Sequence, residues 1–214
     1  MHIKIKINNK AQDDLFGQSK WWGSPDLPAG VDFPQYVDSE GETWDMPFVC
    51  QINLADLSQY DTPLPKEGLL CFFARIDYYL GYDDPNPPME SIWDSEDVKV
   101  IYVSPDDFDI LQQRILVDED DNPIFIPARE ITFEMSEENR SDCHNKLLGD
   151  PDFMPWEDWD EPCEGWKLLL QVDSQEDEEY TLQFMDEGVM YFLIQPDALS
   201  RADFSQVRGA MVSM

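Results

Sequence analysis

Few side chains in this sequence have the types and spacing that catalysis or metal binding requires. It contains only two histidines, His2 and His144, and four cysteines without a CxxC spacing. His144 follows Cys143 in a segment that we expect to be helical, where adjacent side chains point about 100° apart, which disfavours a nucleophilic pair. Beyond Cys143 and His144, no second pair of cysteine or histidine residues has the spacing that a zinc site requires. The sequence predicts no catalytic residue, metal or cofactor, and favours a non-enzymatic protein without excluding an enzyme.

Two glutamines interrupt apolar strands at equivalent places. Gln51 lies within PFVCQINL and Gln171 within KLLLQVD. In one interpretation, the two amides face a small ligand in a cleft between two halves of the protein. In the other, each amide satisfies main-chain groups of a nearby loop. Both interpretations remain open from the sequence.

A short motif occurs twice, as KWWGSPDL at residues 20–27 and as KLLGDPDF at residues 146–153. In each copy the lysine could pair with the following aspartate, Asp26 or Asp152, or neutralise carbonyl groups at a helix end. Tryptophans gather around the same two loops, among them Trp22, Trp156 and Trp159. Aromatic residues beside acids in loops can form a protein-binding surface. The alternative is that they pack onto the core.

The repeat extends beyond this motif. At a constant offset of 120 residues, the matched pairs are Gln51 with Gln171, Gly68 with Gly188 and Phe72 with Phe192. The offset at the KxxGxPD motif is 126 residues. We expect two similar halves, about residues 11–80 and 136–200, related by a pseudo-two-fold axis. Each half has little apolar surface of its own to bury, so one domain over residues 1–214 is predicted.

Apolar runs predict strands at residues 1–10, 47–54, 69–74, 98–103, 167–173 and 188–194. Asn53 and Ser104 are expected to cap short helical turns, and Pro196 to begin another. Longer helical stretches are expected at residues 11–23 and 136–149, each ending at the glycine of the repeated motif. The predicted fold class is α+β, with a mostly antiparallel β-sheet and short helices.

The net charge of the chain limits the classes of molecule that the protein is expected to bind. The chain has 46 acidic and 14 basic residues, a formal net charge of −32. Such a chain repels nucleic acid and anionic lipid but attracts a basic protein, although an acidic surface can also serve solubility alone. With so many acids, carboxylate pairs at glycosidase separations arise by chance.

Cys50 and Cys71 lie in apolar runs, as reduced thiols of a cytoplasmic protein do. Neither a secretory signal nor a membrane span is recognised.

Seven blocks of the sequence resemble, in order, the YwqG-like family, a bacterial domain of unknown function: SKWWGSPDLPAGVDFP, PFVCQINLADL, LPKEGLLCFFA, NKLLGDPDFM, LLLQVDS, DEGVMYFLI and DALSRADFSQV. The resemblance implies a cytoplasmic α+β protein for which no catalytic residue is established. Some members lie in gene neighbourhoods of toxin and immunity systems, which implies a protective or binding role. The chain departs from the family at FMPWEDW, which lacks a glutamine, and at Phe184 and Met185, where the family has tryptophan and glycine.

Taken together, these features favour a cytoplasmic, non-enzymatic protein-binding module whose acidic surface engages a basic protein, such as a toxin. The alternative is a small-ligand binder or an enzyme with a cleft between the two halves, built around Gln51 and Gln171. The sequence leaves the oligomeric state open.

Overall fold

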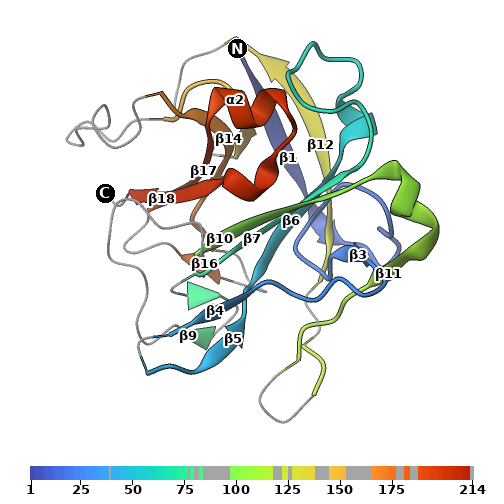
Figure 1. Cartoon of the computed structure of the whole chain (residues 1–214), viewed down its shortest axis with the longest axis vertical. Coiled ribbons are helices and arrows are strands. Elements are labelled where there is room, and N and C mark those ends of the chain that lie inside the picture. Colours follow the sequence, from blue (N-terminus) through green and yellow to red (C-terminus); the bar gives the residue numbers. More distant parts are fainter. Residues whose placement is uncertain are drawn as a thin grey trace.

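The computed structural model describes residues 1–38, 40–76, 78–79, 82–83, 97–117, 122–124, 127–137, 145–152, 165–176, 181–183 and 188–212. Ten of the described strands form one sheet in which all neighbours are antiparallel. In spatial order they are β10 (Val98–Val103), β7 (Leu69–Ala74), β6 (Phe48–Asn53), β2 (Lys20–Trp21), β12 (Arg129–Ser136), β1 (His2–Ala11), β13 (Lys146–Leu147), β14 (Lys167–Asp173), β17 (Val189–Ile194) and β18 (Arg208–Val212). The edge strands β10 and β18 approach each other, so the sheet curls into a nearly closed barrel (Figure 1).

The prediction of an α+β fold is wrong, because the described residues form a mostly antiparallel β structure. Residues 11–23 and 136–149 were expected to be helical, yet their described parts contain strands β2 and β13 and the end of β12. The main chain of Lys20 and Trp21 pairs with β6 on one side and β12 on the other, which an isolated helix could not do. Short apolar segments can adopt either conformation, and here the tertiary pairing decides.

The helical elements of the described residues are short. They are α2 (Pro196–Ser200) and the 3₁₀ turns η1 (Leu54–Leu57), η2 (Pro105–Ile110) and η3 (Phe204–Gln206). The predicted caps are confirmed: the side chain of Asn53 accepts from the N–H of Ala55, and that of Ser104 from the N–H of Asp106. Pro196 begins α2, as predicted. Within the described residues, no helix combines the length and the hydrophobicity that crossing a bilayer requires.

The strand order is symmetrical about the central pair β12–β1. Moving outward from it, β2 corresponds to β13, β6 to β14, β7 to β17 and β10 to β18. Each half extends beyond the expected bounds of residues 11–80 and 136–200, because the symmetrical strands begin with β1 or β12 and end with β10 or β18. The first strand of each half pairs with the second strand of the other half, since β1 lies beside β13 and β12 beside β2. The two halves are therefore joined through exchanged strands. That they arose by duplication stays a prediction.

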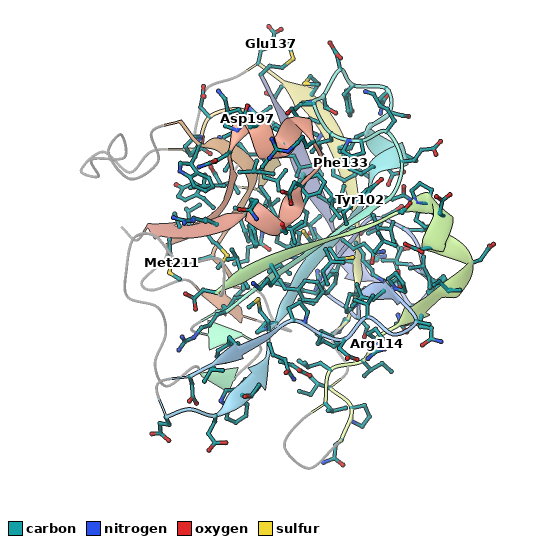
Figure 2. All side chains as sticks on the ribbon, in the orientation of Figure 1. Tyr102, Arg114, Phe133, Glu137, Asp197 and Met211 are labelled. Carbon is teal, nitrogen blue, oxygen red and sulfur yellow. The ribbon has the colours of Figure 1, made fainter. Side chains whose placement is uncertain are left out.

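The main core lies inside the curled sheet, where side chains from both halves fill the interior (Figure 2). Strands β7 and β17 are buried at every residue. Because side chains alternate along a strand, half of each strand faces the interior and half faces a smaller cluster on the outer side. Those outer clusters are centred on Phe73 in the first half and on Tyr191 in the second.

Other described strands form smaller sheets. They are β3 (Asp26–Pro28) with β11 (Leu111–Gln113), β4 (Gln35–Val37) with β5 (Thr43–Asp45), and the set β15 (Gln175–Glu176), β16 (Thr181–Gln183), β8 (Tyr78–Tyr79) and β9 (Tyr82–Asp83). Leu27 of β3 and Leu111 of β11 pack onto the outer cluster of the first half. This packing holds Asp26, the first residue of β3, against β6.

Candidate functional site

The first copy of the repeated motif forms a buried ion pair. Lys20 Nζ lies 2.7 Å from Asp26 Oδ2. Gln51, which is opposite Lys20 in the sheet, joins the pair: its Nε2 donates to Asp26 Oδ2 at 2.8 Å, and its Oε1 accepts from the N–H of Asp26 at 2.9 Å. The three residues are at most 1% exposed. The N–H of Gly17 also donates to Asp26 Oδ2, at 2.8 Å.

The second copy repeats this arrangement with the equivalent residues. Lys146 Nζ lies 2.6 Å from Asp152 Oδ1, and Gln171 Nε2 donates to Asp152 Oδ2 at 2.7 Å. The N–H of Asp152 donates to Gln171 Oε1 at 2.9 Å. The side chain of Asp152 is 21% exposed, so the second cluster reaches the surface where the first does not.

The two clusters also receive matching contacts from the next strand. In the second half, the hydroxyl of Tyr191 donates to the main-chain carbonyl of Asp152 at 2.6 Å. In the first half, Cys71 occupies that position, with its Sγ 4.0 Å from the carbonyl oxygen of Asp26. Burial raises the pKa of the Cys71 thiol, and it also raises that of Cys50. Both thiols are free, as the apolar runs around them predicted.

Both glutamine amides connect a strand to a loop. Gln51 Nε2 donates to the main-chain carbonyl of Gln18 at 2.9 Å in addition to Asp26. Gln51 and Gln171 are both 0% exposed. A ligand could reach these amides only by displacing their bonds within the protein. In a buried network, removing one member leaves the hydrogen-bonding groups of the others unsatisfied. The two amides therefore hold the loop in place, and their hydrogen-bonding groups are already engaged within the protein.

The tryptophan at the first loop is buried. Trp22 is 0% exposed and packs in the main core with Trp21, so it presents no surface to a partner in this structure. Its position follows from a tight turn: Trp22 and Gly23 both have positive φ, and Leu148 and Gly149 repeat that pattern. Trp156 and Trp159 lie outside the described residues.

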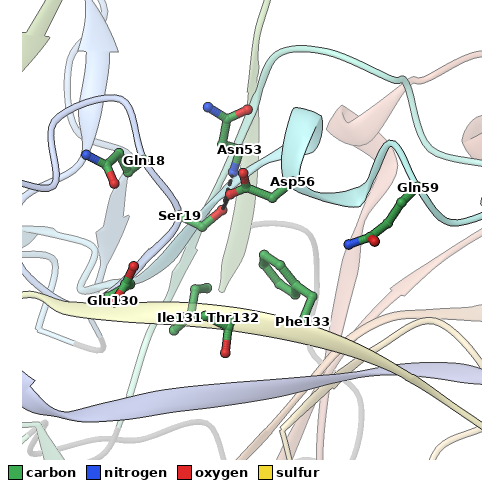
Figure 3. Close-up of a pocket in the computed structure, with 9 residues that line it drawn as sticks. All are labelled: Gln18, Ser19, Asn53, Asp56, Gln59, Glu130, Ile131, Thr132 and Phe133. Atoms are coloured by element: carbon green, nitrogen blue, oxygen red, sulfur yellow. Dashed lines mark hydrogen bonds between the residues drawn. The ribbon is translucent and has the colours of Figure 1, made fainter.

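A pocket of ≈ 330 Å³ opens where the pairing between β2 and β12 ends (Figure 3). The β2–β12 ladder contains two residue pairs, Lys20 with Glu130 and Trp21 with Arg129, whereas β12 continues to Ser136. The gap beside β12 is closed by the segment before β2 and by η1. The lining residues are Gln18, Ser19, Asn53, Asp56, Gln59, Glu130, Ile131, Thr132 and Phe133.

Two carboxylates give this pocket its charge. Asp56 Oδ2 accepts from the hydroxyl of Ser19 at 2.6 Å, and Glu130 Oε2 accepts from Gln12 Nε2 at 3.2 Å. Neither forms an ion pair with another described residue. The ring of Phe133 rises from β12 toward η1, below Asp56 (Figure 3). An anionic pocket with an aromatic wall suits a cation.

Sequence reasoning did not find Asp56, Glu130 or Phe133 as site residues. The pocket depends on the pairing of β2 with β12, which are separated by more than a hundred residues. Neither strand carries a sequence motif from which this pairing could be predicted, and β2 was expected to be helical. Within the described residues, no group of histidine, cysteine and carboxylate side chains is placed to hold a metal ion.

His2 lies beside the second cluster and is 5% exposed. Burial lowers its pKa, and the nearby ammonium of Lys146 lowers it further. The side chain is therefore held neutral to lower pH than a histidine in water.

The chain matches, over residues 19–211, the sequence model of a family described as a domain of unknown function, DUF1963. The chain belongs to this family. The match includes both Lys–Asp–Gln clusters and the lining of the pocket except Gln18. No curated protein matches the chain. The family description gives no activity, so any function has to be argued from the geometry.

Proposed function

We propose that this protein is a non-enzymatic module that binds a basic protein through its acidic surface. The distribution of charge carries the proposal. Of the 14 basic residues, Lys20, Arg129 and Lys146 are at most 3% exposed. Lys20 and Lys146 are paired with their own aspartates, so both clusters are internally neutral. These buried pairs do not absorb the excess of acidic over basic residues, and we expect that excess at the surface, where it would attract a positively charged partner.

The hairpin of β4 and β5 is the described surface that best fits such a partner. Between Gln35 and Asp45 it carries four described acids and no base. Val37 is 61% exposed and Trp44 is 39% exposed. The indole Nε1 of Trp44 donates to Asp38 Oδ2 at 2.9 Å, which fixes the ring on the hairpin. Exposed apolar side chains within a polar rim are typical of protein interfaces, and this hairpin extends away from the barrel (Figure 1).

The sequence resemblance supports a more specific form of this proposal. The family match is consistent with the YwqG-like family, some of whose members neighbour toxin and immunity genes. In this form the partner is a basic toxin, and the protein neutralises it in the cytoplasm.

An affinity capture from the lysate of the protein's own cells tests the proposal. The full chain is compared with a hairpin variant, Glu40→Gln, Glu42→Gln and Asp45→Asn, and with a matched variant, Asp61→Asn, Glu67→Gln and Asp106→Asn. We expect one basic protein to be retained at low ionic strength and released by about 0.5 M salt, because salt screens exposed charges. The hairpin variant should lose this protein and the matched variant should keep it. If an unrelated protein of equal charge retains the same proteins, the proposal is wrong.

A further inference from the structure

We propose that the pocket beside β12 binds a guanidinium group, presented by an arginine side chain. This inference rests on the proposed function, because it states how one residue of a basic partner would be held. The site is a cavity of ≈ 330 Å³ in the wall of the barrel, formed where β12 extends beyond β2. A side chain can therefore enter it and contact several walls at once.

The lining favours a planar cation. Asp56 and Glu130 supply two carboxylates that have no described cationic partner, and Phe133 supplies a half-buried aromatic ring. A guanidinium has five N–H donors in one plane, so it can donate to a carboxylate along one edge and present its other edge to a second carboxylate or its face to a ring. An ammonium is compact and more strongly hydrated, so it would gain less here. A neutral polyol would leave both charges of the pocket uncompensated.

The carboxylates are held in place without a ligand. Ser19, which is 3% exposed, donates its hydroxyl to Asp56 and accepts from the N–H of Asn53 at 2.8 Å. Asn53 caps η1, the turn that carries Asp56. Glu130 is held by Gln12. Because these groups are already positioned, binding would not have to order them, which favours affinity.

The repeated scaffold does not impose this pocket. The residue opposite Lys20 in the sheet is Glu130, whereas the residue opposite Lys146 is Lys4. The lysine of the second cluster thus faces a cation, Lys4, at the place where the lysine of the first cluster faces the pocket carboxylate of Glu130. Of the two Lys–Asp–Gln clusters, only the first therefore has a carboxylate opposite its lysine in the sheet.

An NMR titration of the full chain tests the assignment with three probes of similar size: N-acetyl-arginine methylamide, the lysine compound and the neutral citrulline compound. We expect the arginine probe to shift the amide signals of Gln18, Asp56 and Ile131 in a saturable way, with a dissociation constant on the order of 1 mM. The lysine probe should bind at least about fivefold more weakly, and the citrulline probe should not saturate. These differences follow from the lost planar donors and the lost charge.

Variants locate the binding. Asp56→Asn and Glu130→Gln should each weaken the arginine probe at least about fivefold, because each removes one charge-assisted contact. Asp106→Asn, which removes an acid away from the pocket, should leave the affinity unchanged. Unfolding curves for all three variants should show that they remain folded. Equal shifts with the arginine and citrulline probes, or an unchanged affinity in both pocket variants, would overturn the assignment.

A parallel titration with polylysine separates this inference from the proposed function. If polylysine binds at low salt and the arginine probe does not, the pocket assignment fails and the acidic-surface proposal stands. If the arginine probe binds in the pocket while no basic protein is captured from the lysate, the pocket assignment stands and the proposed function fails.

Discussion

Phe72 and Phe192, which hold matching positions in β7 and β17, pack edge to face inside the barrel. Their ring centroids are 5.2 Å apart and their planes meet at 82°. Both are 0% exposed. Since the two strands come from different halves, the centre of the core is shared between them. Neither half can complete this core alone.

Replacing either ring should therefore destabilise the whole protein. We expect Phe72→Ala and Phe192→Ala each to lower the free energy of unfolding by about 3–5 kcal/mol, and the double variant to cost less than the sum, because both changes remove the same contact. Urea unfolding followed by fluorescence measures this. Phe108→Ala, at a ring that is 36% exposed, is the control and should cost about 1 kcal/mol or less. Two separate transitions would contradict a shared core.

Breaking the ion pair of Lys20 and Asp26 should destabilise the protein more than replacing both of its residues with apolar ones. Asp26→Ala leaves a buried ammonium without its partner, a loss of about 3–5 kcal/mol. The double variant Lys20→Met, Asp26→Leu should recover part of this loss, because no buried charge remains, although the N–H of Gly17 and the amide of Gln51 still lose their acceptor. Asp152→Ala is the matched comparison and should cost less, since that side chain is 21% exposed and water can replace it. A double variant as unstable as Asp26→Ala would contradict this account.

The glycines of the repeated motif should tolerate no side chain. A Cβ on Gly23 would lie 2.6 Å from Ala128 Cβ, and one on Gly149 would lie 2.8 Å from His2 Cβ. Both residues have φ of +80°. We expect Gly23→Ala and Gly149→Ala to destabilise the protein by more than about 2 kcal/mol. Gly30→Ala has a similar φ of +88° but nothing within 4 Å, so it should cost about 1 kcal/mol. Equal losses at all three would rule out the steric part of the argument.

The thiols of Cys50 and Cys71 should be inert in the folded protein. Both are fully buried and burial raises their pKa, so the reactive thiolate is scarce and inaccessible. Alkylation at pH 8 followed by peptide mass mapping should modify neither residue in the native protein and both in urea. Rapid native modification of either residue would show that this part of the sheet opens.

His2 should make stability depend on pH near neutrality. Burial lowers its pKa in the folded protein, so as the pH falls the unfolded chain binds a proton before the folded one does. This contribution is present above about pH 6.5, the value of an unperturbed histidine, and is lost as the pH falls through the lower folded-state pKa. Urea midpoints of the wild type and of His2→Gln, compared between pH 7.5 and 5, should converge toward low pH. Parallel curves would exclude His2 as the cause.

The elements that could be predicted are those specified by local pattern. The apolar runs at Leu69–Ala74 and Val189–Ile194 are long enough to indicate buried strands. The caps at Asn53 and Ser104 depend on contacts two residues away. These features need no knowledge of the rest of the fold.

The elements that could not be predicted depend on distant pairing. Lys20–Trp21 has two residues, too few to show a period, and it becomes a strand because β6 and β12 lie on either side of it. The pocket follows from the same pairing. The lysine, aspartate and glutamine of each cluster could be singled out by their repetition, but their mutual hydrogen bonds could not.

The exchange of strands between the halves has a consequence for biosynthesis. A chain leaving the ribosome carries β2 and β6 early, but β2 gains its other neighbour, β12, only after Glu130 has been made. Strand β1 gains its second neighbour, β13, later still, because β13 begins at Lys146. The wall of the barrel is thus closed late in translation, and until then the nascent chain exposes the edge strands that a chaperone would recognise.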